Sequence, residues 1–225
     1  MTGLTFDGGY AEYTTVPAEA AGSVPESLDA VKAAALLCAG ITTFNALRNT
    51  DVRPGDLVAV QGVGGLGHLA LQYARQMGFE TVALSHSPQK RDLALEVGAD
   101  HFVDTTERDA DQALQDRGGA DLVLATAPAA EPMETVARGV GRNGSLVTVA
   151  NPGETVAVDP GHLISTRSSF EGWASGHAVD WEDTLEFSAL RDITPRLETF
   201  ALEEAESAYE RMTNNEARFR VVLEL

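Results

Sequence analysis

Short apolar runs alternate with longer amphipathic stretches through the middle of the chain. Four-residue runs at 57–60 and 81–84 predict strands that are buried on both faces of a sheet. Between them, residues 68–77 carry apolar side chains at helical spacing and are followed by Gly78, a typical helix stop. The alternation continues to residue 150. It predicts an α/β fold whose doubly wound parallel sheet is connected by right-handed crossovers.

The remaining elements follow from the same periodicities, with glycine and proline as boundaries. Further strands are expected over 101–103, 121–125, 145–150, 169–171 and 219–225, after a short first strand over 8–17. Further helices are expected over 30–39 and on toward residue 47, and over 88–97, 109–115, 131–140, 181–190 and 202–212. Turns are expected at 53–56 and 141–144.

A glycine-rich loop joins the first buried strand of this series to the helix that follows it. Its pattern, G-x-G-x-x-G, is common by itself, but the strand before it and the helix after it make it a dinucleotide-binding signature. The first glycine makes the tight turn, the second lets the backbone approach a pyrophosphate, and the third lets helix and strand pack closely. A tight turn without a ligand is the less favoured alternative. The residues predicted to cradle the phosphates are Gly62, Val63, Gly64, Gly65, Leu66 and Gly67.

The end of the next strand carries the residues that would distinguish NADP from NAD. An acidic residue there binds the ribose 2′-hydroxyl of NAD, whereas small polar or basic residues admit the 2′-phosphate of NADP. Here Ser85 and His86 occupy the position, and Lys90 lies one turn further on together with Arg91. These residues favour NADP, with NAD as the alternative. The competing interpretation is that Ser87 only caps the helix and that both basic side chains are solvated.

Acidic residues outnumber basic ones by more than two to one. The chain has 34 Asp and Glu against 16 Lys and Arg, which gives a formal charge of −18. Such a surface repels phosphate backbones, so we expect no nucleic-acid partner. Only Lys32 and Lys90 are lysines, which fits a protein adapted to a salt-rich cytoplasm or, equally, a GC-rich genome. Stability that stays constant from low to molar salt would contradict the halophilic interpretation.

The chain has no uninterrupted apolar stretch of the ~18 residues that span a bilayer, and its N-terminus lacks the basic and apolar regions of a signal peptide. We therefore expect a cytoplasmic protein without a membrane partner. The single cysteine, Cys38, excludes an internal disulfide. Judged by its alanine- and leucine-rich neighbours alone, Cys38 is best interpreted as a buried core residue.

Four stretches, in sequence order, resemble successive motifs of the zinc-dependent medium-chain alcohol dehydrogenases. They are Asp-Gly-Gly-Tyr-Ala-Glu-Tyr at 7–13, Leu-Leu-Cys-Ala-Gly-Ile-Thr-Thr at 36–43, the glycine loop at 62–67, and Arg-Phe-Arg-Val-Val-Leu at 218–223. The resemblance covers essentially the whole chain. It implies a Rossmann coenzyme-binding domain together with short strands of a GroES-like catalytic domain. The implied domain limits are 1–24 for a remnant of the catalytic domain, 25–191 for the Rossmann domain, and 192–225 for a segment that returns to the catalytic domain.

The resemblance also implies roles for three residues outside the glycine loop. Cys38 matches the third ligand of the catalytic zinc, Thr42 matches a position beside the nicotinamide, and Arg220 matches a pyrophosphate contact. In that family, zinc polarises the alcohol oxygen so that the alcohol loses its proton before hydride leaves for nicotinamide. The resemblance thus implies an NAD(P)-dependent oxidoreductase for alcohol or aldehyde substrates. It assigns no catalytic residue beyond the metal ligand.

The chain departs from the family pattern where the other zinc ligands should be. A catalytic zinc needs about three protein ligands, and in the family the first zinc cysteine and a Gly-His-Glu segment precede the motif at 7–13. Here Met1 stands six residues before that motif. We therefore expect a chain that lacks most of its catalytic domain, offers an incomplete zinc site and is inactive alone. The histidines share no metal-ligand spacing with Cys38 and are expected at the surface or as helix caps; they are His68, His86, His101, His162 and His177.

Two other functions compete with this one. The first is a dinucleotide-binding module without catalysis, and the second is a zinc-free quinone reductase relative, against which the setting of Cys38 argues. Family dimers usually extend the sheet through its last strand, so we expect a homodimer or homotetramer that pairs through residues 169–172. Apolar surface is expected at both ends of the chain, because their barrel partners are missing.

Overall fold

The computed structural model describes residues 6–225, which pack as two compact units. The sheet unit is the continuous segment Thr42–Ser175, and the terminal unit combines the chain up to Ile41 with Gly176–Leu225. These units are defined by contacts within the structure, whereas the domain limits expected after residues 24 and 191 come from the family resemblance. Those limits stay a prediction. The beginning of the expected remnant over 1–24 lies outside the described residues.

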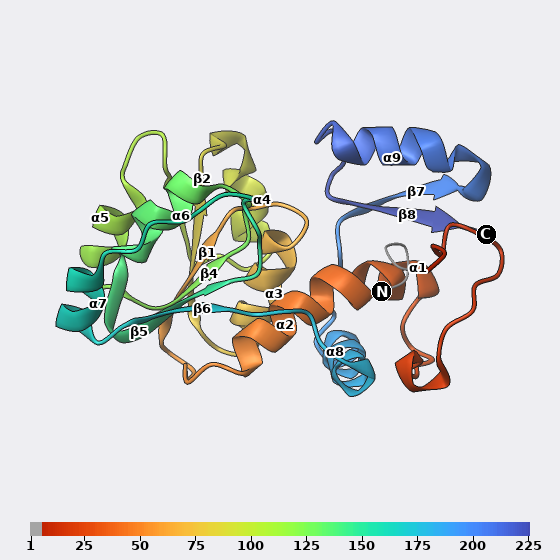
Figure 1. Ribbon diagram of the computed structural model, residues 1–225, viewed down its shortest axis with the longest axis horizontal. Coiled ribbons are helices and arrows are strands. Elements are labelled where there is room, and N and C mark those ends of the chain that lie inside the picture. Colours follow the sequence, from red (N-terminus) through yellow and green to blue (C-terminus); the bar gives the residue numbers. More distant parts are fainter. Residues whose placement is uncertain (1–5) are drawn as a thin grey trace. The chain divides into compact units, whose positions relative to one another are not determined.

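The sheet unit is built on six parallel strands in the order β3-β2-β1-β4-β5-β6 (Figure 1). The chain winds outward from β1 to β3 and then crosses back to β4, so the order reverses between β1 and β4. The predicted doubly wound Rossmann sheet is thereby confirmed. The strands are β1 (Leu57–Gln61), β2 (Glu80–Ser85), β3 (His101–Asp104), β4 (Ala120–Ala125), β5 (Val140–Thr148) and β6 (Ser169–Gly172).

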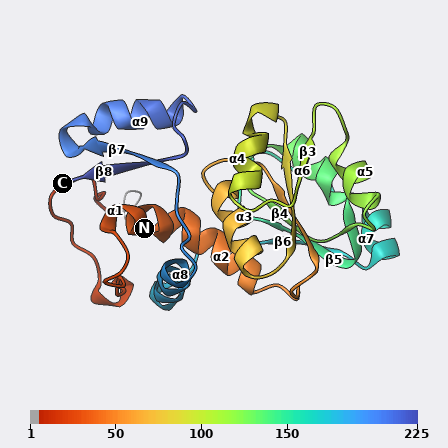
Figure 2. The ribbon, with the colours of Figure 1, turned by 180° about the vertical axis from the view of Figure 1, so that it is seen from behind.

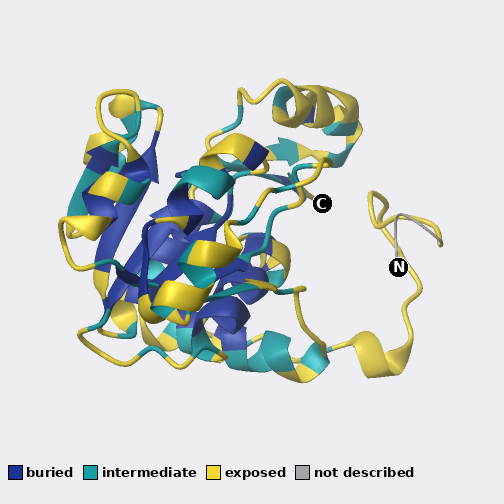
Figure 3. Ribbon diagram, turned by 60° about the vertical axis from the view of Figure 1, so that its left-hand side comes forward, coloured by how far each residue is buried: buried dark blue, intermediate teal, exposed yellow. Residues whose placement is uncertain are grey.

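Helices cover both faces of this sheet, as two opposite views show (Figures 1 and 2). All residues of β1 are buried, which explains why its sequence is an uninterrupted apolar run. Successive side chains point to opposite faces, and Ala59 joins the core formed with Leu114 and Met133 of two covering helices. Figure 3 shows the central strands of the sheet in dark blue, the colour of buried residues. The helices are α2 (Ile41–Arg48), α3 (Gly67–Gln76), η3 (Pro88–Lys90), α4 (Arg91–Glu96), α5 (Ala110–Gln115), α6 (Ala130–Ala137) and α7 (Pro160–Thr166).

One of the predicted turns is part of a strand. Gly141 and Gly144 were expected to bracket a turn, but β5 already begins at Val140 and has an irregular register opposite β4. A Cβ atom on Gly144 would lie 2.6 Å from the carbonyl oxygen of Ala120. Glycine is therefore needed here for the close approach of two strands rather than for a turn.

The terminal unit consists of helices and a two-stranded parallel sheet. Arg211 forms an ion pair with Glu198. Hydrogen bonds from this guanidinium and from the Arg218 backbone lower the pKa of Glu198. The ion pair ties α9 to β7, and the predicted last strand is confirmed as β8. The elements are η1 (Ala18–Ala20), α1 (Ala30–Ala35), η2 (Leu36–Gly40), α8 (Ala178–Leu190), β7 (Leu197–Ala201), η4 (Leu202–Glu204), α9 (Ala205–Thr213) and β8 (Arg220–Glu224).

The strand expected over 8–17 is not formed. A strand needs a neighbour for its backbone N–H and C=O groups, and among residues 6–225 no strand pairs with this segment. Its aromatic residues Tyr10 and Tyr13 are 69% and 90% exposed. Tyr10 also borders a hollow of about 240 Å³ together with Tyr209 and Met212, which are exposed as well. The expectation of apolar surface at both ends of the chain is confirmed.

Three helical segments, α1, η2 and α2, follow one another without a break from Ala30 to Arg48. The middle segment has π-helical hydrogen bonding, which is rare and often found at functional sites. By length and mean hydropathy (1.5) the run could cross a membrane, although Lys32 interrupts it. Within the structure 61% of it is buried. Such burial is typical of the core helix of a folded domain, so the run is weak evidence for a membrane span.

The carboxylate of Asp100 ties β2 to the loop before β3 and gives a pH-dependent contribution to stability. It accepts hydrogen bonds from the Thr81 backbone (2.9 Å) and from Arg75. Burial by itself raises the pKa of Asp100, but the bonds from Thr81 and Arg75 outweigh burial and lower the pKa below its ordinary value of 3.8. The lowered pKa stabilises the folded protein above pH 3.8, and this stabilisation is lost as the pH falls below that value.

We therefore expect Asp100→Asn to lower the melting temperature at pH 7 more than at pH 3. The measurement is thermal unfolding by circular dichroism over this pH range, with Asp92→Asn on the exposed side of α4 as the control. A constant difference between Asp100→Asn and the unsubstituted protein at all pH values would contradict the assignment.

Candidate functional site

The glycine loop leaves the carboxyl end of β1, next to the point where the strand order reverses. In open α/β sheets, ligands bind in the crevice beside such a reversal. Because β1 lies between β2 and β4, the loop shares this edge of the sheet with Ser85 and Thr126, which stand at or just after the ends of those strands (Figure 1). The sequence-predicted loop and ribose residues are thus brought to one edge.

Each of the three motif glycines has a distinct geometry. Gly62 has φ +95°, and a Cβ atom there would lie 2.8 Å from that of Ala127. A Cβ atom on Gly67 would overlap the carbonyl oxygen of Gly62 and lie 2.9 Å from its carbonyl carbon. In contrast, a Cβ atom on Gly64 would have nothing within 4 Å. Gly62 and Gly67 thus permit close packing, whereas Gly64 faces open space that a ligand can occupy.

The loop presents backbone N–H groups that no acceptor in residues 6–225 satisfies. Those of Gly64, Gly65 and Leu66 donate to no other group of the described chain, and all three residues are partly exposed. They precede α3, a helix of 10 residues. Unsatisfied N–H groups and the positive end of the helix dipole together attract anions. This arrangement fits a diphosphate group.

Residues just after β4 hold the start of the glycine loop by hydrogen bonds. The Thr126 hydroxyl lies 2.9 Å from the carbonyl oxygen of Gln61 and 3.0 Å from that of Gly62. The side-chain oxygen of Gln61 accepts the backbone N–H of Ala127 (3.2 Å). Thr126 is not among the residues predicted for the site. A signal for it does exist in the sequence. Thr126 is a hydroxyl residue directly after a buried strand, and the doubly wound order places that strand next to the one that precedes the glycine loop.

The prediction that His68 lies at the surface or only caps a helix is wrong. Its side chain is fully buried in the first turn of α3. Its Nδ1 atom lies 2.8 Å from the carbonyl oxygen of Gly64. A carbonyl oxygen can only accept, so Nδ1 carries the proton and donates. Among the other histidines, His177 is the N-cap of α8 as expected, and His86 is exposed.

The ribose position contains the predicted polar and basic groups. The Lys90 ammonium donates to the carbonyl oxygen of Val63 (2.7 Å), so this side chain is not merely solvated. Ser87 makes no side-chain cap; instead its backbone N–H donates to the Ser85 hydroxyl (3.1 Å). The Arg91 guanidinium lies 5.6 Å from the centre of the Phe102 ring. Lys90 is therefore the basic side chain that reaches the loop.

A carboxylate that is not among the predicted site residues lies beside this position. Asp104 ends β3 and is the register partner of Ser85. Hydrogen bonds from the Thr106 hydroxyl and backbone N–H lower the pKa of Asp104, with a smaller contribution from His86. Asp104 therefore stays ionised at neutral pH. It places a negative charge at the end of the strand next to Ser85.

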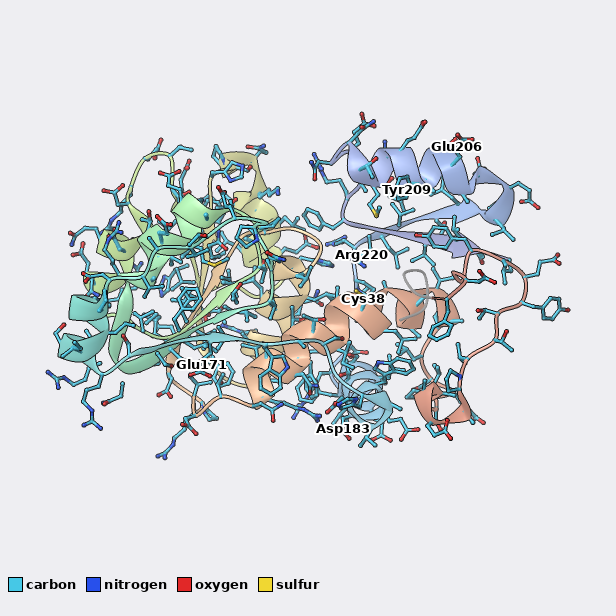
Figure 4. All side chains as sticks on the ribbon, viewed as in Figure 1. Cys38, Glu171, Asp183, Glu206, Tyr209 and Arg220 are labelled. Carbon is cyan, nitrogen blue, oxygen red and sulfur yellow. The ribbon has the colours of Figure 1, made fainter. Side chains whose placement is uncertain are left out.

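Cys38 lies on the π-helical segment and is exposed (Figure 4). The expectation of a buried core cysteine, made from its neighbours alone, is wrong, although Leu36, Ala39 and Gly40 of the same segment are buried. Within residues 6–225 no group of three or more His, Cys, Asp or Glu side chains could hold a metal ion. Residues 1–5, Met-Thr-Gly-Leu-Thr, contain none of these types. The residues of this chain therefore do not fit a catalytic zinc site.

The other two residues assigned by resemblance belong to different units. Thr42 begins the sheet unit and is buried, four residues after Cys38 on the continuous helical run. Arg220 begins β8 in the terminal unit and is partly buried (Figure 4). Their roles beside nicotinamide and pyrophosphate stay predictions.

The family model described as zinc-binding dehydrogenase matches residues 65–189. Among curated proteins, an alcohol dehydrogenase (notN) of Aspergillus sp. strain MF297-2 is 42% identical over 223 residues, which are 99% of this chain and 66% of that protein. The structure of an alcohol dehydrogenase from Aeropyrum pernix is similar with a TM-score of 0.88 and 29% identity, covering 100% of this chain and 67% of that one.

A third similar protein was solved with a coenzyme. A protein described as a zinc-binding dehydrogenase from Sinorhizobium meliloti, bound to NADP, has a TM-score of 0.81 and 27% identity, over 90% of this chain and 62% of that one. The chain spans about two thirds of the length of the curated relatives it matches.

Proposed function

This chain belongs to the zinc-binding dehydrogenase family, and from that premise we propose that it forms the coenzyme-binding part of an NAD(P)-dependent alcohol dehydrogenase. The observation that carries the proposal is the set of three unsatisfied backbone N–H groups in front of α3. The open side of Gly64 leaves room for a diphosphate against them. The likeness to the NADP-bound protein of Sinorhizobium meliloti supports the same site.

The residues of the chain would bind and orient the coenzyme. The loop N–H groups would hold its phosphates, Lys90 and Ser85 would face the ribose, and Thr42 would lie beside the nicotinamide. Bound nicotinamide supplies a hydride acceptor or donor for alcohol and aldehyde substrates. Residues 6–225 hold no fitting set of metal ligands, so the contribution of this chain is to bind and orient the coenzyme. Titration with NADPH and NADH, followed by fluorescence, tests the site; binding of neither coenzyme would refute it.

NADP is proposed as the preferred coenzyme, because Lys90 reaches the loop edge and Ser85 leaves room for a phosphate. We expect Lys90→Gln to weaken NADPH binding about tenfold, since a charge-assisted hydrogen bond is lost. NADH binding should change much less, because glutamine keeps an N–H donor for the Val63 carbonyl oxygen. Arg91→Gln removes the same charge from the residue that stacks on Phe102, so it is the matched control. Tighter binding of NADH than of NADPH at matched salt would reverse the assignment.

The lone Cys38 favours a second candidate function, a dinucleotide-binding protein that does not catalyse by itself. Metal analysis and an NADPH–aldehyde assay of the same preparation separate the two candidates. Bound coenzyme without zinc and without turnover would support the second. Turnover with about one zinc per chain would support the first and would mean that another chain supplies the missing ligands.

We also propose that the protein forms a homodimer through β6. This strand is the edge of the six-stranded sheet and pairs only with β5 among the described residues. An unpaired strand edge presents backbone groups that a second copy can satisfy. Light scattering coupled to size exclusion would give twice the chain mass of 23.8 kDa; a monomer at micromolar concentration would contradict the proposal.

A further inference from the structure

The buried side chain of His68 is hydrogen-bonded to a peptide of the glycine loop, and the direction of this peptide sets where one of the loop N–H groups points. The peptide between Gly64 and Gly65 has its carbonyl oxygen bonded twice by His68, from the ring Nδ1 (2.8 Å) and from the backbone N–H (3.1 Å). A trans peptide is planar, and its C=O and N–H groups point in opposite directions. With the carbonyl directed at a fully buried residue, the N–H of Gly65 must point away from the interior.

The preceding peptide is oriented in the same manner by another side chain. Lys90 binds the carbonyl oxygen of Val63, which turns the N–H of Gly64 away from Lys90. Glycine has no side chain to restrict its backbone, so consecutive glycines rotate freely unless something holds them. The loop contains two consecutive glycines, Gly64 and Gly65, where this freedom is greatest.

We propose that His68 is a positioning residue for coenzyme binding: its ring locks the Gly64–Gly65 peptide so that the Gly65 N–H donates to the pyrophosphate. This inference rests on the proposed coenzyme site. A preformed donor costs less ordering on binding than a mobile one, so the ring contributes to affinity without touching the ligand. A purely structural histidine would contribute to folding stability and leave the coenzyme affinity of the folded protein unchanged.

Two substitutions separate these roles. His68→Leu keeps the apolar volume but removes the donor, and His68→Asn keeps a donor nitrogen at the position of Nδ1. We expect His68→Leu to weaken NADPH binding about tenfold, as for loss of one well-oriented bond to a charged group. His68→Asn should restore binding to within about twofold of the unsubstituted protein, because the peptide is held again. Thermal unfolding of each variant without coenzyme reports the structural contribution separately.

The outcomes distinguish this inference from the proposed function. If the unsubstituted protein binds neither NADPH nor NADH, both fail. If it binds NADPH and folded His68→Leu binds equally well, only the role of His68 fails. Should His68→Leu not fold, the amide resonance of Gly65 in the unsubstituted, ¹⁵N-labelled protein decides. An order parameter of about 0.85 for this amide in the absence of coenzyme, as for rigid backbone, supports a locked peptide, and one below about 0.6 overturns it.

Discussion

Gly67→Ala is expected to destabilise the sheet unit by about 3 kcal/mol or more. The new Cβ atom would overlap the backbone carbonyl of Gly62 and also lie 3.1 Å from the Thr126 hydroxyl. A backbone group cannot change its rotamer to make room. The strand β1 and the helix α3 would have to separate, and the Thr126 bonds that hold the loop would be broken.

The measurement is thermal unfolding without coenzyme, where such a loss corresponds to a decrease of about 10 °C for a protein of this size. Gly64→Ala is the matched control, because it adds the same methyl group to the same loop in open space. A melting temperature of Gly67→Ala within about 2 °C of the control would show that the loop relaxes at little cost.

Gly64→Ala should have the opposite profile, with folding intact and coenzyme binding about 100-fold weaker, or ~3 kcal/mol. The added methyl group meets no atom of the protein. It would occupy the space in which a pyrophosphate must approach the N–H groups of Gly65 and Leu66. Steric exclusion of this kind acts on both coenzymes, unlike loss of the Lys90 charge.

Titration of the folded variant with NADPH and NADH checks the expectation. Gly9→Ala, which also adds a methyl group in open space but lies in the terminal unit, controls for the substitution itself. Equal affinities in Gly64→Ala and Gly9→Ala would mean that the coenzyme does not pass over this side of the loop. The proposed function would then need another phosphate site.

The sheet was predictable because its signals are local and strong. Strands buried on both faces must be continuously apolar, as in β1, and the helices between them end at glycines such as Gly78 and Gly98 with positive φ. The glycine loop was recognisable because its backbone geometry admits few other residues. Helix α7 was not predicted, since its 7 residues carry too short a periodic pattern.

The parts that failed depend on contacts between distant segments. Gly144 passes so close to β4 that a Cβ atom on it would lie 2.6 Å from the carbonyl oxygen of Ala120. Nothing near Gly144 in the sequence indicates this approach. The segment over 8–17 has strand-forming residues, but a strand also requires a partner. From the sequence, His68 was expected at the surface or as a helix cap. Its ring can be buried only because the folded loop places the Gly64 carbonyl oxygen within hydrogen-bonding distance. Burial is hardest to predict from sequence for polar residues whose hydrogen-bond partners are brought to them only by the folded chain.

The division of the chain into a continuous and an interrupted unit has a consequence for biosynthesis. All of Thr42–Ser175 has been translated before any of Gly176–Leu225. The sheet can therefore close its parallel pairings while the last 50 residues are still being added, in keeping with the tendency of domains to fold in order of synthesis. The N-terminal segment has to wait, because its packing partners in the terminal unit are translated only after the sheet unit. Ala33 and Ala35 of α1, which are buried in the folded protein, stay exposed to chaperones throughout that interval.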